Sequence, residues 1–345
     1  MRVAIVILNW NTVDYLSRFI PGVLSGMGDD DSLFVADSGS TDGSLEMLSQ
    51  SFPQVKQIPL HSNRGFAEGY NVVLGGIDAE YYLLLNTDIE VSSGWLAALV
   101  EWMESNPDCG ICSPKLHALD KCGDGWVRTE RFEYAGAAGG FIDRFGYPFC
   151  RGRVLSRLET DNGQYDNADS DVFWVSGAAL MIRRSLWEEL GGFDAQFFAH
   201  MEEIDLCWRA RNRGSRVCVV PQSVVYHIGG GTLPKESPFK LKLNYRNSLW
   251  MLRRNLPWAI GPMRAHCRIA FRYVLDWGSA LVYLLQGKRD FAKAVIQAHR
   301  EAAQRDIKPV RGGVKVPPAK VGVLLQSALR GKRIFSYLRR YEGCN

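Results

Sequence analysis

Residues 3–37, VAIVILNWNTVDYLSRFIPGVLSGMGDDDSLFVAD, contain the pattern that decides the fold. An apolar run at 3–8 precedes an amphipathic stretch at 13–24 and a second apolar run at 32–37, which predicts strand, helix and strand. The alternation continues with strands expected at 55–60 and 81–86 and helices expected at 44–52, 65–77 and 92–105, the last opened by Ser92 or Ser93. Continuous apolar strands separated by helices predict an α/β fold: a mostly parallel sheet with helices on both faces.

Polar residues follow three of these strands, at the edge where ligands bind in such sheets. They are Asn9, Asp37 and the trio Asn86, Thr87 and Asp88. Side chains alternate along a strand, so Asn86 and Asp88 are expected on one face. Asp88 suits Mg²⁺ or Mn²⁺ and Asn86 a ribose hydroxyl, although a strand-end turn with Asp as a helix cap is an alternative.

Asp37 ends a buried strand, where a carboxylate without a hydrogen-bond donor is costly. A donor is therefore expected, such as the imide N–H of uracil or thymine or a ribose hydroxyl. The alternative is an ordinary turn with an N-cap, since the segment 37–44 is DSGSTDGS.

Arg64 and His227 occupy loops at the same predicted edge. Arg64 precedes an expected helix, where it would contact a diphosphate or base unless it is simply solvated. His227 follows a strand and precedes Gly229–Gly231, which would let backbone approach a phosphate; a structural histidine is the alternative. Imidazole also suits Mn²⁺ better than Mg²⁺.

Composition and charge narrow the class of protein. The chain has no G-x-G-x-x-G after the first strand and no G-x-x-x-x-G-K-[ST], which argues against a nicotinamide dehydrogenase and a P-loop NTPase. The apolar run at 3–8 is too short for a signal sequence, and nothing reaches ~18 apolar residues, so a cytoplasmic protein is expected. Residues 1–234 carry 18 Lys and Arg against 31 Asp and Glu, whereas residues 235–345 carry 23 against 6.

Two regions are therefore expected. Residues 1–233 form the α/β region, with a first half at about 1–115, a long, partly ordered loop at 118–170 and a second half at 171–233. Residues 234–345 form a helical, basic region. This division predicts different partners for the two regions.

Seven segments in order resemble family-2 glycosyltransferases of the GT-A fold, closest to bacterial rhamnosyltransferase-like enzymes of cell-surface polysaccharide synthesis. They are DSGSTDGS (37–44), NRGFAEGYN (63–71), LLLNTDIEV (83–91), SGAALMIRR (176–184), GGFDAQFF (191–198), EEIDLCWRARNRG (202–214) and VYHIGGG (225–231). The resemblance covers roughly residues 1–233 and is weak across 118–170. It implies that residues 1–233 are a GT-A catalytic domain, with the nucleotide-sugar half at about 1–115 and the acceptor and catalytic half at 171–233.

The resemblance implies an inverting transferase that uses a UDP- or dTDP-linked sugar and Mn²⁺ or Mg²⁺. It places Asn9, Asp37, Arg64, Asn86 and Asp88 around the nucleotide sugar, and Asp88 and His227 on the metal or diphosphate. Glu203 matches the general base. Trp174, Gly177, Glu202 and Asp205 are expected on the acceptor side or in support.

Two features depart from the family pattern. Asn-Thr-Asp at 86–88 replaces D-x-D, which leaves one carboxylate for the metal, and the base is Glu203 rather than the commoner Asp. Asp205 and Arg209, four residues apart, are expected to form an ion pair on the helix surface. Glu202 lies about 100° around the helix from Glu203 and is expected to orient the loop.

Two other functions compete with a glycosyltransferase: a sugar-nucleotide nucleotidyltransferase, and a non-catalytic protein that binds nucleotide sugars or glycans. The first would need a Gly-rich, basic loop after the first strand, where the chain has LNWNTVD at 8–14. The second is disfavoured because the metal and base positions are filled.

The basic region is expected to bind an anionic membrane at the inner face of the cell membrane, near a saccharide or lipid-linked acceptor. An apolar stripe is predicted in its helices, with arginines beside it and lysines after it, and the alternative is a helix packed on the catalytic domain. No nucleic-acid motif accompanies the charge, so nucleic acid is not expected. The stripe comprises Phe271, Val274, Leu275, Gly278, Val282 and Leu285, flanked by Arg268 and Arg272, with Trp277 and Tyr283 nearby and Lys288, Arg289 and Lys293 following.

Overall fold

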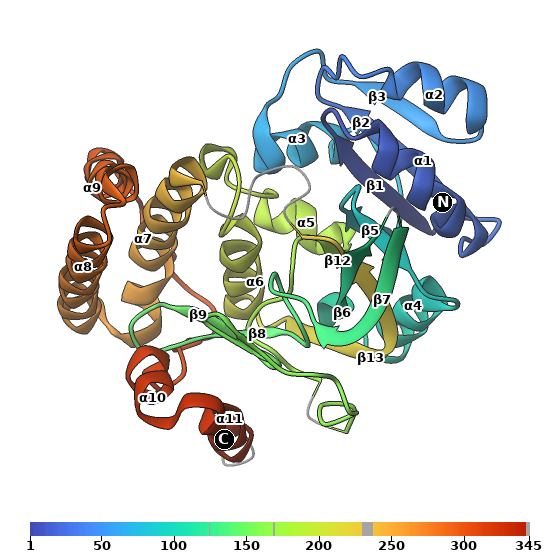
Figure 1. Ribbon diagram of the computed structural model, residues 1–345. Helices are drawn as coiled ribbons and strands as arrows, with labels where there is room; N and C mark the ends of the chain where they lie inside the picture. Colours follow the sequence, from blue (N-terminus) through green and yellow to red (C-terminus); the bar gives the residue numbers. More distant parts are fainter. Residues whose placement is uncertain (124, 168–169, 230–236, 343–345) are drawn as a thin grey trace.

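A mixed sheet forms the centre of the molecule, of which the computed structural model describes residues 1–123, 125–167, 170–229 and 237–342 (Figure 1). Within these residues nine strands pair in the order β3-β2-β1-β4-β12-β6-β13-β5, with β7 beside β6. The strands are β1 (Val3–Asn9), β2 (Ser32–Asp37), β3 (Lys56–Pro59), β4 (Tyr81–Leu85), β5 (Ile89–Val91), β6 (Cys109–Cys122), β7 (Gly125–Phe132), β12 (Ala179–Arg183) and β13 (Arg216–His227). Strands β1 to β4 run parallel, as predicted, while β12 runs antiparallel to β4 and β6.

Helices cover both faces of the sheet, which confirms the predicted α/β architecture. One apolar core joins Val3, Ile5 and Ile7 of β1 to helices α1 (Val13–Ser25), α2 (Ser44–Ser51) and α4 (Trp95–Ser105). The alternate β1 residues Ala4 and Val6 face a second core with α3 (Gly65–Leu74), α5 (Arg184–Leu190) and α6 (Glu202–Asn212). The alternation of strand side chains thus divides an apolar strand between two helical layers.

The fourth helix starts later than the sequence predicts. Neither Ser92 nor Ser93 caps it: α4 begins at Trp95, after Gly94 in the left-handed conformation (φ 70°). The Ser92 hydroxyl donates instead to the Val224 carbonyl at 2.7 Å, which ties the start of this segment to β13.

The segment 118–170, expected to be a loop, contains much ordered β structure. It includes the end of β6, all of β7, and a second, antiparallel sheet in the order β11-β10-β9-β8. The strands of the second sheet are β8 (Gly140–Ile142), β9 (Pro148–Cys150), β10 (Arg153–Val154) and β11 (Arg157–Leu158). Strands of two or three residues are too short to show a period of two, which is why the sequence does not reveal them.

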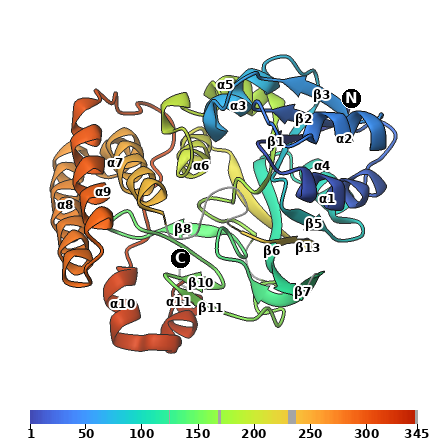
Figure 2. The ribbon, with the colours of Figure 1, turned by 45° about the horizontal axis from the view of Figure 1, so that its top comes forward.

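The C-terminal region is helical, as predicted. Helices α7 (Pro238–Ile260), α8 (Pro262–Leu285) and α9 (Arg289–Gln304) lie together beside α6 in both views (Figures 1 and 2). Helix α10 (Val323–Arg330), a 3-10 turn (Gly331–Arg333) and α11 (Ile334–Glu342) pack on the small sheet through residues that include Phe149, Val154, Val323 and Ile334. The expected boundary at 233/234 lies outside the described residues. In the part of the chain that the structure describes, no helix is long and apolar enough to cross a membrane.

Candidate active site

Asn9 and Asp37 lie side by side at the ends of β1 and β2, which pair in parallel register. Both are buried, and the Asn9 amide donates to Asp37 Oδ1 at 2.8 Å. Asp37 Oδ2 accepts from the backbone N–H groups of Gly39 and Ser40. The expectation that Asp37 needs hydrogen-bond donors is confirmed, and this turn and Asn9 supply them; contact between Asp37 and a nucleotide stays a prediction.

Arg64 immediately precedes α3 and is largely exposed. Its guanidinium pairs with Glu68 at 2.8 Å across one helical turn. This geometry matches the solvated alternative, and a contact between Arg64 and a diphosphate stays a prediction.

Asn86, Asp88 and His227 come together where β4 ends and β13 meets β5. His227 is opposite Ile89 in the β13–β5 pair, so its ring lies next to the residues that precede β5. Its Nε2 is 3.1 Å from Asp88 Oδ1 and 3.5 Å from the Asn86 amide nitrogen. Asn86 and Asp88 thus face one imidazole nitrogen, as their spacing predicts. Gly230 and Gly231, expected to help bind phosphate, lie outside the described residues.

Glu133, just after β7, is the buried residue that sequence reasoning missed here. Its carboxylate lies 3.2 Å from His227 Nδ1 and accepts from the Ala135 N–H. Burial alone would lower the pKa of His227, but Asp88 and Glu133 raise it to about 10. Burial alone would raise the pKa of Glu133, yet His227 holds it below its usual value. No motif surrounds Glu133, and its strand falls in the segment expected to be a loop.

The donor atoms of Asp88 and His227 fit a divalent metal ion. Two ligands at about 2.1 Å from an ion and at right angles to each other lie about 3 Å apart, close to the 3.1 Å between Asp88 Oδ1 and His227 Nε2. Among the described residues there is no group of three His, Cys, Asp or Glu side chains placed to hold a metal. Such an ion would therefore depend on further oxygens from its ligand.

Glu202 and Glu203 open α6, where the helix dipole favours negative charge. Glu202 is buried, and burial followed by the charge of Glu203 raises its pKa well above the usual value. Burial raises the pKa of Glu203 to about 7. In the described part of the chain, the Oε2 atom of each has no hydrogen-bond partner. A carboxyl with a pKa near neutrality and an unused oxygen is suited to proton transfer.

The loop before these acids has an unusual backbone. Phe198, His200 and Met201 are all left-handed, with φ of 64°, 70° and 74°, a conformation that side chains other than glycine's disfavour. The Asn247 amide of α7 contacts three carbonyls of this loop, those of Phe197 (2.9 Å), Ala199 (2.9 Å) and His200 (2.7 Å). A C-terminal helix thus holds the segment that sets the start of α6.

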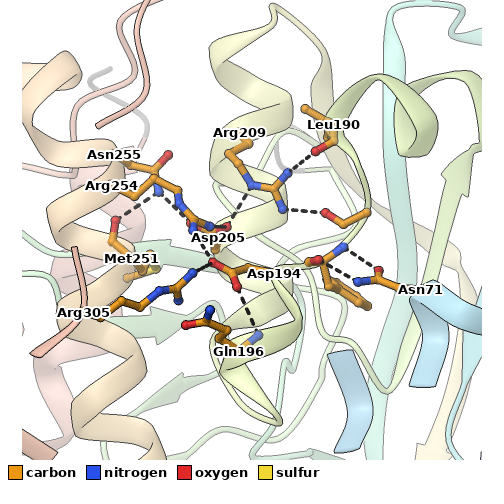
Figure 3. Close-up of polar contacts among 12 residues, drawn as sticks. Asn71, Leu190, Asp194, Gln196, Asp205, Arg209, Met251, Arg254, Asn255 and Arg305 are labelled. Carbon is orange, nitrogen blue, oxygen red and sulfur yellow. Dashed lines mark hydrogen bonds and ion pairs between the residues drawn. The ribbon is translucent and has the colours of Figure 1, made fainter. Parts of the chain in front are cut away.

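Asp205 is buried rather than on the helix surface, which corrects the sequence prediction. Its expected pair with Arg209 exists at 2.8 Å, but Arg254 and Asn255 of α7 also bond to it, at 2.8 and 2.9 Å (Figure 3). Arg254 continues to Asp194, which Arg305 also contacts at 2.7 Å. Burial alone would raise the pKa of Asp194, but these two arginines lower it. The network fastens α6 to α7.

Gly177 and Ala178 connect the two acidic sites. The Ala178 carbonyl accepts from the Asn86 N–H at 2.9 Å. A Cβ atom on Gly177 would lie 3.5 Å from the Cβ of Glu203 and 3.2 Å from the Phe66 ring. Glu203 thus lies beside Gly177, and Asn86, whose amide faces His227, is bonded to the next residue, Ala178. Trp174, by contrast, is buried, and its indole N–H donates to the Phe141 carbonyl, so it supports the core.

Comparison with known proteins identifies the class. The chain is 24% identical over 272 residues to an N-acetylglucosaminyl-diphospho-decaprenol L-rhamnosyltransferase of Mycobacterium tuberculosis, covering 75% of this chain and 87% of the relative. The fold is similar to that of the mannosyltransferase PcManGT from Pyrobaculum calidifontis in complex with GDP-Man and Mn²⁺ (TM-score 0.53, 15% identity, 88% and 87% covered). It is also similar to that of S. aureus TarS 1-349 in complex with UDP-GlcNAc (TM-score 0.55, 13% identity, 99% and 88% covered). The protein is thus a glycosyltransferase rather than a nucleotidyltransferase or a binding protein.

The family model for glycosyl transferase family 2 matches residues 4–191, more than half of the chain. The chain belongs to this family, as its motifs predicted. The matched range ends before α6, so it includes neither Glu203 nor His227.

Proposed function

We propose that the protein is an inverting, metal-dependent glycosyltransferase of cell-surface glycan synthesis. It would transfer a hexosyl or deoxyhexosyl group from a UDP- or dTDP-linked sugar to a saccharide or lipid-linked saccharide. The observation that carries the proposal is that Glu203 lies beside Gly177, while Asn86, next to the Asp88–His227 pair, is hydrogen-bonded to the adjacent Ala178.

The donor would lie along the strand ends. In this proposal Asp37 and Asn9 form the base-binding turn, Asn86 contacts the ribose and Arg64 contacts the diphosphate. Asp37 already accepts three hydrogen bonds within the chain, so its role is to hold the turn as well as to contact the nucleotide.

Asp88 and His227 would hold Mn²⁺ or Mg²⁺, with Glu133 fixing the imidazole through Nδ1. The bound metal would supply charge neutralisation for the departing diphosphate. Single-carboxylate metal binding makes the imidazole important, because Asn86 stands where the family pattern has an acid.

Glu203 would act as general base. It accepts the proton of the acceptor hydroxyl while that oxygen forms a bond to the anomeric carbon and the bond from carbon to diphosphate oxygen breaks. The nucleoside diphosphate leaves with the electron pair, and the configuration at carbon inverts. The charge of Glu203 raises the pKa of Glu202 and so favours the protonated form of that neighbour.

The acceptor is proposed to be lipid-linked and the enzyme to work as a peripheral protein on the cytoplasmic face of the cell membrane. The name of the mycobacterial relative, an N-acetylglucosaminyl-diphospho-decaprenol L-rhamnosyltransferase, supports this proposal.

Glu203→Gln tests the reaction. Purified protein is incubated with a panel of nucleotide sugars, and both donor binding and release of nucleoside diphosphate are measured. We expect the variant to bind donor like the wild type and to lose turnover by orders of magnitude, while the exposed control Glu188→Gln keeps it. Near-normal release by Glu203→Gln would transfer the role to Glu202 or Asp205, and synthesis of a nucleotide sugar from a nucleoside triphosphate would contradict the proposed reaction.

A further inference from the structure

Helix α8 turns its apolar side outward. It lies at the outer edge of the molecule in both views, with α7 on its inner side (Figures 1 and 2), and it packs against α7 and α9. Eight large apolar side chains within it are between 47% and 80% exposed: Met263, Phe271, Val274, Trp277, Leu281, Val282, Leu284 and Leu285. They recur at helical spacing over 23 residues, which at 1.5 Å per residue is about 33 Å. The stripe predicted from the sequence exists, and it is not covered by the catalytic domain.

The polar side of α8 is buried instead. Arg272, expected beside the stripe, bonds to Asp276 (2.8 Å) and to the Gly146 carbonyl (3.1 Å), and its guanidinium lies over the Tyr147 ring. Asp276 also pairs with His299 of α9 at 3.3 Å. Turning the apolar stripe inward would break the contacts that join this polar side to its neighbours, namely Arg272 to the Gly146 carbonyl and Asp276 to His299. The outward direction of the stripe is therefore fixed by the packing.

The charges around the stripe are positive. The one acid within α8 is Asp276, which is buried. Arg264 is exposed near the first turn, and Lys288 and Arg289 are exposed just beyond the last; Asp290, the nearest exposed acid, pairs with Lys293. Helix α8 thus has an exposed apolar face, cations at both ends and no exposed carboxylate of its own. Such a helix fits a partner with an apolar interior and an anionic surface.

We propose that the α8 face (Met263 to Leu285) lies in the interface of an anionic lipid bilayer, with Arg264, Lys288 and Arg289 at the headgroups. An amphipathic helix of this kind lies in the plane of the membrane, and Trp277 suits the boundary between headgroups and acyl chains. A second copy of the chain is the rival occupant. Pairing two α8 faces brings cations against cations in either orientation, which disfavours it. The inference is independent of the transfer chemistry, although it fits a lipid-linked acceptor.

Vesicle flotation with the full-length protein tests this proposal, with vesicles of phosphatidylcholine alone or mixed with phosphatidylglycerol. We expect binding to the mixed vesicles at low salt, release at high salt, and a blue shift of Trp fluorescence. The double variant Val274→Glu/Leu281→Glu should bind at least tenfold more weakly. The matched control Val127→Glu, at an exposed apolar residue of β7, should bind like the wild type.

Three results would overturn the proposal: wild type that ignores the mixed vesicles, a double variant that binds them equally well, or a wild-type dimer that the double variant abolishes without vesicle binding. Thermal unfolding and hydrolysis of the nucleotide sugar are measured on the same samples. A variant that no longer binds vesicles but still hydrolyses the nucleotide sugar has lost membrane binding alone. The two measurements therefore distinguish failure of the membrane proposal from failure of the proposed reaction.

Discussion

Asn247 offers the sharpest test of how the catalytic helix is held. Its amide faces three carbonyls of the loop 197–200, all within 2.9 Å. An intramolecular hydrogen bond contributes about 0.5–1.5 kcal/mol net, and a buried group left without a partner costs about 1–3 kcal/mol. The left-handed conformations of Phe198, His200 and Met201 each cost about 1–2 kcal/mol, so this loop is expected to adopt another conformation when the amide is removed.

We therefore expect Asn247→Ala to destabilise the ordered loop by about 2–4 kcal/mol. If that loss falls on the placement of Glu203, kcat drops about 30- to 1,000-fold, since 1.36 kcal/mol is a factor of ten. Donor binding should change little, because the strand ends that carry Asn9 and Asp37 do not contact α7 through this amide. Asn247→Asp should be worse, because a carboxylate would face the same carbonyls.

The assay is steady-state kinetics with separate measurement of donor binding and thermal unfolding. Asn244→Ala is the matched control: it lies on the same helix, and among the residues that the structure describes its amide bonds within α7, to the Lys240 carbonyl at 2.8 Å. Equal kcat in the two alanine variants would refute the reasoning, because it would mean that the loop keeps its conformation without Asn247.

Three further predictions follow from the site. Because burial raises the pKa of Glu203 to about 7, turnover should rise with pH through that value as the base ionises, and a flat profile between pH 6 and 8 would argue against this residue as base. The same raised pKa means that, between the usual pKa of Glu and about 7, the folded protein binds more protons than the unfolded chain. The free energy of unfolding should therefore fall as pH rises through this window. Glu202→Gln or Glu203→Gln should reduce that fall, as measured by denaturant unfolding at pH 5 and 8. Chelation should abolish turnover and Mn²⁺ should restore it, while Asp88→Ala and Glu133→Gln should weaken Mn²⁺ binding measured by calorimetry; full activity in chelator would remove the metal from the mechanism.

The first half of the fold could be predicted because its strands are buried on both faces. Strands such as β1 and β4 each contain a continuous apolar run, and in the helices between them apolar residues recur at helical spacing. The antiparallel strands β8 to β11 have only two or three residues each, and their burial depends on neighbours such as Trp174 and the C-terminal helices. Nothing local in the sequence encodes that environment.

The candidate site shows the same contrast between residues that local patterns predict and residues whose environment comes from distant parts of the chain. Asn86, Asp88 and His227 were predicted because they follow strands that meet at one edge. Glu133 was missed because its partner His227 is 94 positions away in the chain. Asp205 was misplaced on the surface because its pair with Arg209 is local, whereas the burial comes from Arg254 and Asn255, 49 and 50 residues later. The stripe of α8 was predicted, but its direction depends on Arg272 and Asp276 being buried.

The attachment of α6 to α7 also sets the order in which the protein can become active during synthesis. A ribosome that has released residues 1–231 has delivered all seven family motifs, including Glu203 and His227, yet the carbonyls of residues 197–200 still lack Asn247. The second partner of Asp194 arrives later still, with Arg305. The nascent chain thus carries all the proposed catalytic residues before it can fix their positions, and the contacts that hold α6 are complete only after about another 75 residues, at Arg305.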